Sequence, residues 1–298
     1  TSTSASKLDT PRFDYNPSTL AAQGLLIEEA RTNSIRNNTM QGAVAGTPGT
    51  LPTNWGVSGL GTLTQQVVGT GTVNGITYID LRFSGTTSTT SVSIRHEPSG
   101  TGGAAAVNGQ TWSQSAWTAV VAGSTANITQ AGLSANIFDS GGAFLSSIPY
   151  TNFIANTTST LTRVAPSGTI ATVGTAFIQP QIYLTFSSGV AIDITLRIGL
   201  PQLEQGAFAT SVIPTTTMAL TRNADVASVN TLSPWFNSTA GTLYAQVSLL
   251  TVSNDANRWV AAISDGTTSN YIGLFRQTDQ QPVGQVQTSA GTQAALGA

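Results

Sequence analysis

The amino-acid sequence predicts an all-β protein: an antiparallel β-sandwich (jelly roll) with an N-terminal arm and a second, incomplete β-sandwich. Hydrophobic and polar residues alternate with a period of two along many segments, which is the pattern of strands with one buried face. Turns rich in Gly, Ser, Asn and Pro separate these segments. No stretch between them has the pattern of a crossover helix, which parallel strands require. Short strands with such turns are typical of sandwiches and jelly rolls.

The N-terminal arm is expected to cover residues 1–42. Within it, Leu20–Ile35 is the only segment with helical character, because Leu25, Leu26 and Ile27 are contiguous and two acids follow. A short helix and an extended arm packed on the sandwich are equally compatible with this segment.

The first sandwich is expected over residues 43–229, and its clearest strand is Val190–Ile198. Apolar residues at every second position form one face, and Asp193 and Arg197 lie on the other. A slip of one residue would bury both charges, so the register is well determined. Tyr78–Phe83 alternates in the same way. Further strands are expected at Thr62–Val68, Thr90–Arg95, Thr111–Val121, Ala126–Phe138, Ala143–Ile148, Thr160–Val164 and Phe177–Phe186.

A second pattern of strands begins near residue 230. Strands are expected at Thr242–Val252, Arg258–Ser264 and Ser269–Arg276, with a hairpin turn at Asp265-Gly266. Residues 230–298 are fewer than the roughly 100 that an all-β sandwich of this kind uses. We therefore expect this region to be the start of a second β-sandwich that is truncated in the chain.

The composition is poor in charge, and this excludes several classes of protein. Only 8% of the 298 residues are charged, the net charge is −2, and Thr and Ser together number 78. Disorder requires low hydrophobicity or high net charge, and 40% of the residues are hydrophobic. A nucleic-acid partner has no electrostatic basis here. No apolar run is long enough for membrane insertion, and the beginning of the sequence lacks the apolar core of a secretory signal.

The residues of most catalytic and metal centres are scarce. Cysteine is absent and His96 is the only histidine, so thiolate sites and multi-histidine metal sites are excluded. No nucleophile elbow or phosphate-binding loop occurs. We therefore expect no cofactor, no metal and no catalytic residue. His96 lies at a strand end before a turn, where a polar residue at the rim of the sandwich is expected.

Glycoside hydrolysis needs only two carboxylates, so it stays open as an alternative. The sequence has 13 acidic residues. Glu28 and Glu29 are adjacent and would point to opposite faces of a strand. Glu97, Asp139 and Asp193 are scattered, and surface or hydrogen-bonded acids are the plainer interpretation of them.

The tryptophans are the candidates for sugar binding. Trp112 and Trp117 are an odd number of residues apart on one expected strand, so they face opposite sides of the sheet. One is expected in the core and the other, Trp117, exposed. Trp55 lies in a Pro- and Gly-containing loop at the end of the sandwich. An exposed indole beside amides and arginines can stack on a sugar ring, which makes Trp55 and Trp117 candidate carbohydrate-binding residues; core packing is the plainer interpretation of both.

Four segments resemble parts of known bacteriophage proteins. Pro11–Pro17 with Gly24–Asn33 is similar to a signature of phage virion proteins of the tail or tail fibre. Pro201–Thr215 with Thr221–Val226 resembles the closing segment of the same module. Thr111–Ser124 looks like the central strand of a carbohydrate-binding-module-like jelly roll, and the stretch from Trp235 to Arg276 looks like the opening of a concanavalin/laminin-G-like sandwich.

This resemblance implies a multidomain virion component, exposed on the phage particle and frequently trimeric, and it supplies no catalytic residue. We expect a structural and adhesive, non-enzymatic component of a tail fibre or similar appendage that displays a β-sandwich to host-surface glycans. Its expected partners are itself, as a homotrimer, other virion proteins and a host glycan. The alternatives are a glycan depolymerase and a purely architectural capsid or neck decoration protein.

Overall fold

The computed structural model describes residues 11–15, 19, 21–153, 159–234, 236–237, 239–248 and 257–297. It divides the chain into two compact units, Thr1–Ala227 and Ser228–Ala298. In the described residues all regular structure is β-strand, apart from one short 3₁₀ turn, η1 (Gly100–Gly102). No helix there is long and apolar enough to cross a membrane.

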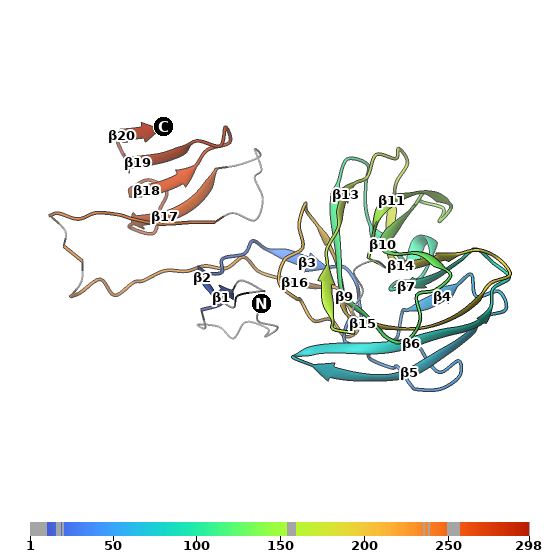
Figure 1. Ribbon diagram of the computed structural model, residues 1–298. Helices are drawn as coiled ribbons and strands as arrows, with labels where there is room; N and C mark the ends of the chain where they lie inside the picture. Colours follow the sequence, from blue (N-terminus) through green and yellow to red (C-terminus); the bar gives the residue numbers. More distant parts are fainter. Residues whose placement is uncertain are drawn as a thin grey trace. The chain divides into compact units, whose positions relative to one another are not determined.

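The first unit is the antiparallel β-sandwich that the sequence predicts, and its two sheets lie face to face (Figure 1). The first sheet has the order β11-β10-β14-β7-β4, with β8 also paired to β14. Its strands are β4 (Gly56–Ser58), β7 (Ser91–Arg95), β8 (Ala104–Ala105), β10 (Ile128–Phe138), β11 (Phe144–Asn152) and β14 (Phe177–Phe186).

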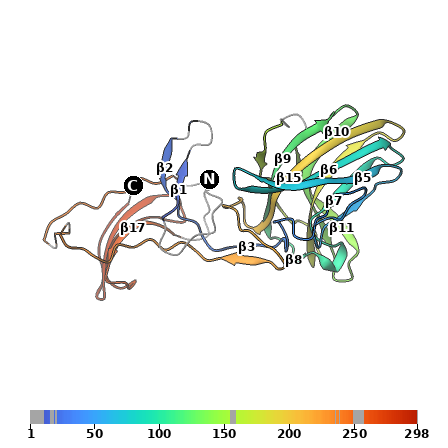
Figure 2. The same cartoon turned by 90° about the horizontal axis from the view of Figure 1, so that it is seen from below.

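The second sheet has the order β12-β9-β15-β6-β5, with β13 also paired to β9. Figure 2 shows its long strands from below. They are β5 (Thr64–Val73), β6 (Ile76–Thr86), β9 (Thr111–Gly123), β12 (Thr162–Val164), β13 (Ser167–Thr169) and β15 (Ala191–Gln205). All pairs in both sheets are antiparallel.

The core between the sheets confirms the predicted alternation. The even-numbered apolar residues of β15 from Ile192 to Ile198 are buried. The odd-numbered apolar residues of β6 from Ile79 to Phe83 are buried beside them on the neighbouring strand. From the facing sheet, Ile182 and Leu184 of β14 complete the same cluster. At roughly 1.5–3 kcal/mol for each large aliphatic side chain, this burial is the main force that holds the sheets together.

The outward face of β6 and β15 carries the charges that the alternation places there. Arg197 binds Asp80 of the neighbouring strand through two hydrogen bonds of 2.8 Å. Arg82 binds Asp193 in the same two-pronged way at 2.8 and 2.7 Å. These cross-strand pairs match the register that buries the apolar set.

The arm is extended, and its described residues contain no α-helix. β1 (Phe13–Tyr15) pairs with β2 (Ala22–Leu25) as a hairpin. β3 (Arg31–Asn33) then pairs with β16 (Leu220–Arg222), which comes from the end of the first unit. Of the two interpretations of Leu20–Ile35, the extended one is therefore correct for residues 21–35. Leu20 lies outside the described residues.

The second unit contains one four-stranded antiparallel sheet, β17-β18-β19-β20. Its strands are β17 (Arg258–Ser264), β18 (Tyr271–Arg276), β19 (Pro282–Thr288) and β20 (Gly291–Gly297). The prediction of β17 is confirmed to the residue, and that of β18 to within two residues. The strand expected at Thr242–Val252 is not found over 242–248, and residues 249–252 lie outside the described part.

Candidate functional site

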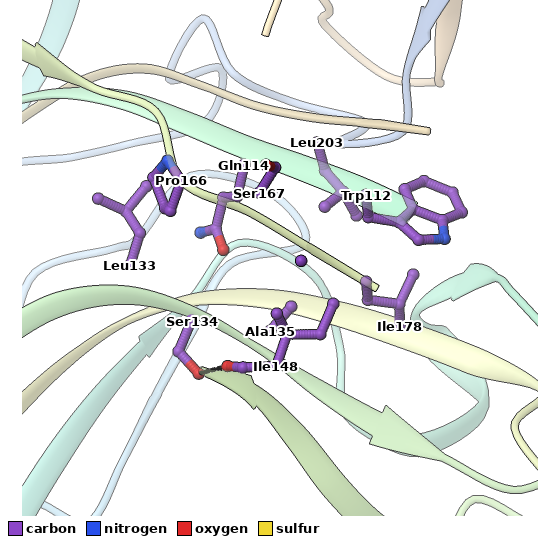
Figure 3. A pocket seen from close by; sticks show the side chains of 11 residues that line it. Trp112, Gln114, Leu133, Ser134, Ala135, Ile148, Pro166, Ser167, Ile178 and Leu203 are labelled. Carbon is purple, nitrogen blue, oxygen red and sulfur yellow. Dashed lines mark hydrogen bonds between the residues drawn. The ribbon is translucent and has the colours of Figure 1, made fainter. Parts of the chain in front are cut away.

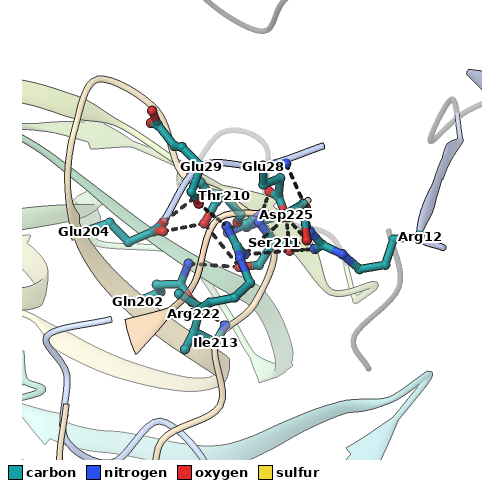
Figure 4. A network of polar contacts seen from close by, with 11 residues as sticks. Arg12, Glu28, Glu29, Gln202, Glu204, Thr210, Ser211, Ile213, Arg222 and Asp225 are labelled. Atoms are coloured by element: carbon teal, nitrogen blue, oxygen red, sulfur yellow. Dashed lines mark hydrogen bonds and ion pairs between the residues drawn. The ribbon is translucent and has the colours of Figure 1, made fainter. Parts of the chain in front are cut away.

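Glu28 is the centre of a network of ion pairs and hydrogen bonds that ties the arm to the end of the first unit (Figure 4). Its carboxylate accepts hydrogen bonds from the backbone N–H and hydroxyl of Ser211, at 2.7 and 2.5 Å. Arg12 donates to it at 2.5 Å, and a guanidinium nitrogen of Arg222 lies 3.1 Å away. Ser211 also accepts from both arginines, at 2.8 and 2.9 Å.

Asp225 completes this network. Its carboxylate accepts hydrogen bonds from Arg12 and from the backbone N–H of Glu28, while its own N–H donates to the Glu28 carbonyl at 2.8 Å. Burial works against the Glu28 carboxylate, but the hydrogen bonds from Ser211 and Arg12 and the charge of Arg222 outweigh it and lower its pKa. Glu28 is therefore ionised at neutral pH, and residues almost 200 positions apart are held together by charge.

A neighbouring set of polar contacts lies deeper, where β15 ends. Glu204 is fully buried and accepts hydrogen bonds from the backbone N–H of Thr210, at 2.9 Å, and from its hydroxyl. Arg163 donates to the Thr210 carbonyl at 2.7 Å. Asn33, also fully buried, donates to the Ile213 carbonyl and accepts from the Leu203 N–H. Because these polar groups are paired, the segment after β15 can lie on the sheet without a large desolvation penalty.

Arg31 lies beside this network and is positioned by three contacts. Its guanidinium pairs with Glu29 and lies 5.0 Å from the centre of the Phe208 ring. It also crosses directly over Gly206, where an added Cβ would lie 1.5 Å from a guanidinium nitrogen. Gly206 has φ +140°, which side-chain-bearing residues rarely adopt. The glycine therefore provides both the backbone conformation and the space that Arg31 needs.

An open groove of about 730 Å³ runs past Arg31 at this end of the sandwich. Four separate segments form its walls: residues 29–34 from the arm and β3, residues 109–112 at the start of β9, residues 205–206 at the end of β15, and Thr221 of β16. Its volume is within the range of ligand sites for small molecules. We take this groove as the candidate binding site.

A second cavity lies inside the sandwich and does not fit a ligand (Figure 3). It has a volume of about 10 Å³ and is lined mainly by apolar residues such as Trp112, Leu133 and Ile178. Gln114 and Ser134 add polar groups, and Ser134 donates to the Ile148 carbonyl at 3.4 Å. This volume is enough for a single water molecule, so it cannot hold a sugar ring.

Both tryptophans predicted to bind sugar are buried, each about 8% exposed. Trp117 does face the side of the sheet opposite to Trp112, because the two pack in different clusters. That side is covered by Leu200 and Val212, and the guanidinium of Arg163 lies 4.8 Å from the Trp117 ring. The expected exposure of Trp117 is therefore wrong.

Trp55 is anchored in the core rather than presented on a loop. Its indole N–H donates to the Asn37 carbonyl at 2.8 Å, and its ring lies 4.5 Å from that of His96. Neither Trp55 nor Trp117 offers an open face to a sugar, and we do not include them in the candidate site.

His96 is fully buried, so the prediction of a residue at the polar rim is wrong. Its backbone N–H continues the pairing of β7 with a bond to the Pro180 carbonyl, and this directs the ring inward against Trp55. Neither ring nitrogen has a hydrogen-bond partner among the described residues. Burial lowers the pKa of His96 to about 3, so the ring is neutral at physiological pH.

The scattered acids of the sequence have separate partners. Glu97 is buried and accepts three hydrogen bonds from Arg36, at 2.6, 2.8 and 2.6 Å. Asp139 accepts from the N–H groups of its own turn, and Asp193 pairs with Arg82. Within the described ranges, no three His, Cys, Asp or Glu residues gather as a metal site would require.

The groove and the network could not be located by the sequence-based search for aromatic side chains. The network residues Arg12, Glu28, Ser211, Arg222 and Asp225 do lie in the phage-like segments, which are Pro11–Pro17 with Gly24–Asn33 and Pro201–Thr215 with Thr221–Val226. The available signal was the concentration of opposite charges in two short motifs of a chain that is otherwise poor in charge. Their pairing depends on contacts over more than 180 residues, which no local pattern reveals.

Comparison with known proteins finds distant likeness only. No protein-family model matches the chain, and no curated protein matches it. Among solved structures, the enzymatically active domain of tailspike protein 4 of bacteriophage CBA120 is 13% identical with a TM-score of 0.28, over 52% of this chain and 20% of that one. The chain thus spans about a fifth of that tailspike domain.

Two further structures are matched over most of their own length. A CBM4 structure, a carbohydrate-binding module, is 14% identical with a TM-score of 0.33, over 58% of this chain and 100% of that one. The tripod (BppUct-A-L) of the baseplate of bacteriophage Tuc2009 is 11% identical with a TM-score of 0.36, over 90% of this chain and 96% of that one. At these values the likeness is one of all-β architecture alone.

Proposed function

We propose that the chain is a structural and adhesive component of a phage virion, in a tail fibre or similar appendage, and that it presents its β-sandwich to host-surface glycans. The observation that supports this most directly is the network around Glu28. The two segments whose sequences resemble phage virion proteins, near residues 11–33 and 201–226, supply Arg12, Glu28, Ser211, Arg222 and Asp225 to one cluster.

The physical character of the first unit suits display. Two six-stranded sheets with a continuous apolar core make a rigid support. The chain has few charges, so its surface consists mainly of hydroxyl, amide and backbone groups, which form hydrogen bonds with sugars without strong electrostatic selectivity. We propose that several copies in a homotrimer raise a weak affinity per site by avidity.

Fractionation of purified particles tests the virion assignment. Antibody against the chain should detect it in gradient-purified virions at a constant number of copies per particle, and light scattering of the isolated full chain should give three times the monomer mass. A chain that stays at the top of the gradient and is absent from virions would refute the assignment.

We further propose that the role is binding without bond cleavage. Glu28 is held by Arg12 and Arg222, and Asp193 pairs with Arg82. Burial raises the pKa of Glu97, but its carboxylate is engaged by Arg36, so none of these three acids is free to act as a general acid. Host capsule or lipopolysaccharide incubated with the chain should release no new reducing ends. Their appearance would favour a depolymerase instead.

A further inference from the structure

The groove beside Arg31 has charged groups of very unequal accessibility. The side chain of Glu29 is 44% exposed, whereas that of its partner Arg31 is 9% exposed. Arg31 is covered by its contacts with Gly206 and Phe208. A ligand in the groove therefore meets a carboxylate rather than a guanidinium. A carboxylate accepts hydrogen bonds from hydroxyl groups and repels other anions.

The remaining walls offer uncharged hydrogen-bonding groups. The side-chain oxygen of Gln110 already accepts from the Val107 N–H and from the Trp112 indole, at 3.0 and 3.2 Å, which leaves the amide N–H groups of Gln110 for another acceptor. Gln205 is exposed and its side chain makes no hydrogen bond within the described residues. The hydroxyls of Thr32 and Thr221 lie 2.7 Å apart at the exposed edge.

Beneath the groove, one buried donor lacks a partner among the described residues. Arg31 is nine-tenths buried, and its Nε has no hydrogen-bond partner in the described part of the chain. A buried guanidinium N–H without an acceptor is destabilising. Because this Nε is fully buried, the donors that a ligand meets in the groove are the amides of Gln110 and Gln205 rather than the guanidinium.

We propose that this groove binds a neutral, hydroxyl-rich glycan and discriminates against acidic ones. Glu29 accepts from sugar hydroxyls, and Gln110 and Gln205 donate to sugar oxygens. Acidic sugars are disfavoured because the accessible charge is negative and the positive charge beneath it is already paired. This inference rests on the proposed glycan-binding function and adds to it the binding site and the class of sugar.

A glycan array that carries neutral, uronic-acid, sialylated and phosphorylated glycans tests the proposal with the full-length chain. The wild type should bind neutral members. Gln205→Trp, which fills the groove from an exposed position, should abolish that signal. Glu29→Gln, which replaces a charged acceptor by a neutral one, should weaken it about tenfold. Asp193→Asn, which removes an exposed acid on another face, is the matched control and should bind as the wild type does.

The possible results of this experiment distinguish the assignment of the groove as the binding site from the proposed adhesive function. Neutral binding that survives in Gln205→Trp, or binding confined to acidic glycans, would overturn the groove assignment while adhesion stands. No binding to any glycan would overturn both the groove and the adhesive role, whereas membership in the virion is decided independently by particle fractionation. The midpoint of thermal unfolding is measured for each variant. A midpoint equal to that of the wild type shows that a loss of glycan binding is not caused by unfolding.

Discussion

Gly206 is the residue on which the position of Arg31 depends. An alanine there would place its Cβ 1.5 Å from a guanidinium nitrogen, on a backbone with φ +140°. Both the displaced guanidinium and the backbone strain are destabilising, so we expect Gly206→Ala to lower the free energy of unfolding by about 1–3 kcal/mol. Urea unfolding followed by tryptophan fluorescence measures this.

Gly69→Ala is the control for this substitution. Gly69 lies on β5, has no positive φ and has no atom within 4 Å of an added Cβ. The free energy of unfolding of the Gly69→Ala variant should stay within about 0.5 kcal/mol of that of the wild type. Equal losses in the two variants would show that Arg31 does not lie over Gly206.

His96 should make the protein sensitive to mild acid. Burial lowers its pKa from 6.5 to about 3, so below pH 6.5 the unfolded chain binds a proton that the folded chain does not. Stability then falls as the pH falls, by about 2 kcal/mol between about pH 6.5 and pH 5. The neighbouring Glu97, whose pKa is raised by burial, acts in the opposite direction near its own pKa.

The variant His96→Phe isolates this effect. Phenylalanine keeps a ring against Trp55, removes two buried nitrogens without partners, and cannot titrate. We expect its stability at pH 7 to equal or exceed that of the wild type, and the difference between the two to widen as the pH falls to 5. A difference that stays constant over this range would contradict the burial of a neutral histidine.

Burial of single residues was the least predictable property. The odd spacing of Trp112 and Trp117 places them on opposite sides of β9, as found. Leu200 and Val212 cover the outer side of β9, where Trp117 lies, and both are more than 80 residues away in the sequence. The strand before His96 was predicted from its alternation. The pairing continues for one more residue, through the hydrogen bond from the His96 N–H to the Pro180 carbonyl, and this turns the ring inward.

At the level of elements, strands with one buried apolar face were predictable and strands rich in Gln, Gly and Ala were not. β14 and β17 begin and end where the alternation does. β19 and β20 were missed because Gly, Gln and Ala interrupt their sequences and no regular alternation of apolar and polar residues marks them, so their strand structure depends on pairing with β18 and with each other.

The clasp formed by Glu28, Arg12, Ser211, Arg222 and Asp225 joins the arm to the closing segment of the first unit. The Glu28 side chain is only 5% exposed, so Glu28→Gln would leave Arg222 without its counter-charge and Arg12 with Asp225 alone. We expect a loss of about 3–5 kcal/mol in the free energy of unfolding. The arm should also become susceptible to trypsin at Arg12, which mass spectrometry of the digest would detect.

Asp193→Asn provides the comparison for the clasp. The pair that it breaks, with Arg82, is half exposed on the outer face of β6 and β15. Exposed pairs add little stability because water screens them, so this variant should unfold and resist trypsin like the wild type. If Asp193→Asn lost as much free energy of unfolding as Glu28→Gln, burial would not explain the contribution of the clasp to stability.

At the scale of the whole molecule, the clasp also fixes where the first unit ends. Arg12 is near its beginning and Asp225 near its end, and the two side chains pair directly. The two ends of the described part of the first unit therefore lie together, next to the groove that Glu29 and Thr221 share. No sequence pattern could predict this groove, because its walls come from four segments that only the complete sandwich brings together.

Closure at Asp225 predicts that the first unit folds without the second. The core and the clasp lie entirely within residues 11–225. A chain that ends at residue 227, the boundary between the compact units, should therefore keep one cooperative thermal transition at the temperature of the corresponding transition of the full chain. Calorimetry of both proteins measures this. A chain that ends at residue 219 should unfold at a clearly lower temperature, because Glu28 loses Arg222, Arg12 loses Asp225, and β3 loses its pairing with β16. Equal transition temperatures for the two shortened chains would mean that the clasp does not close the unit.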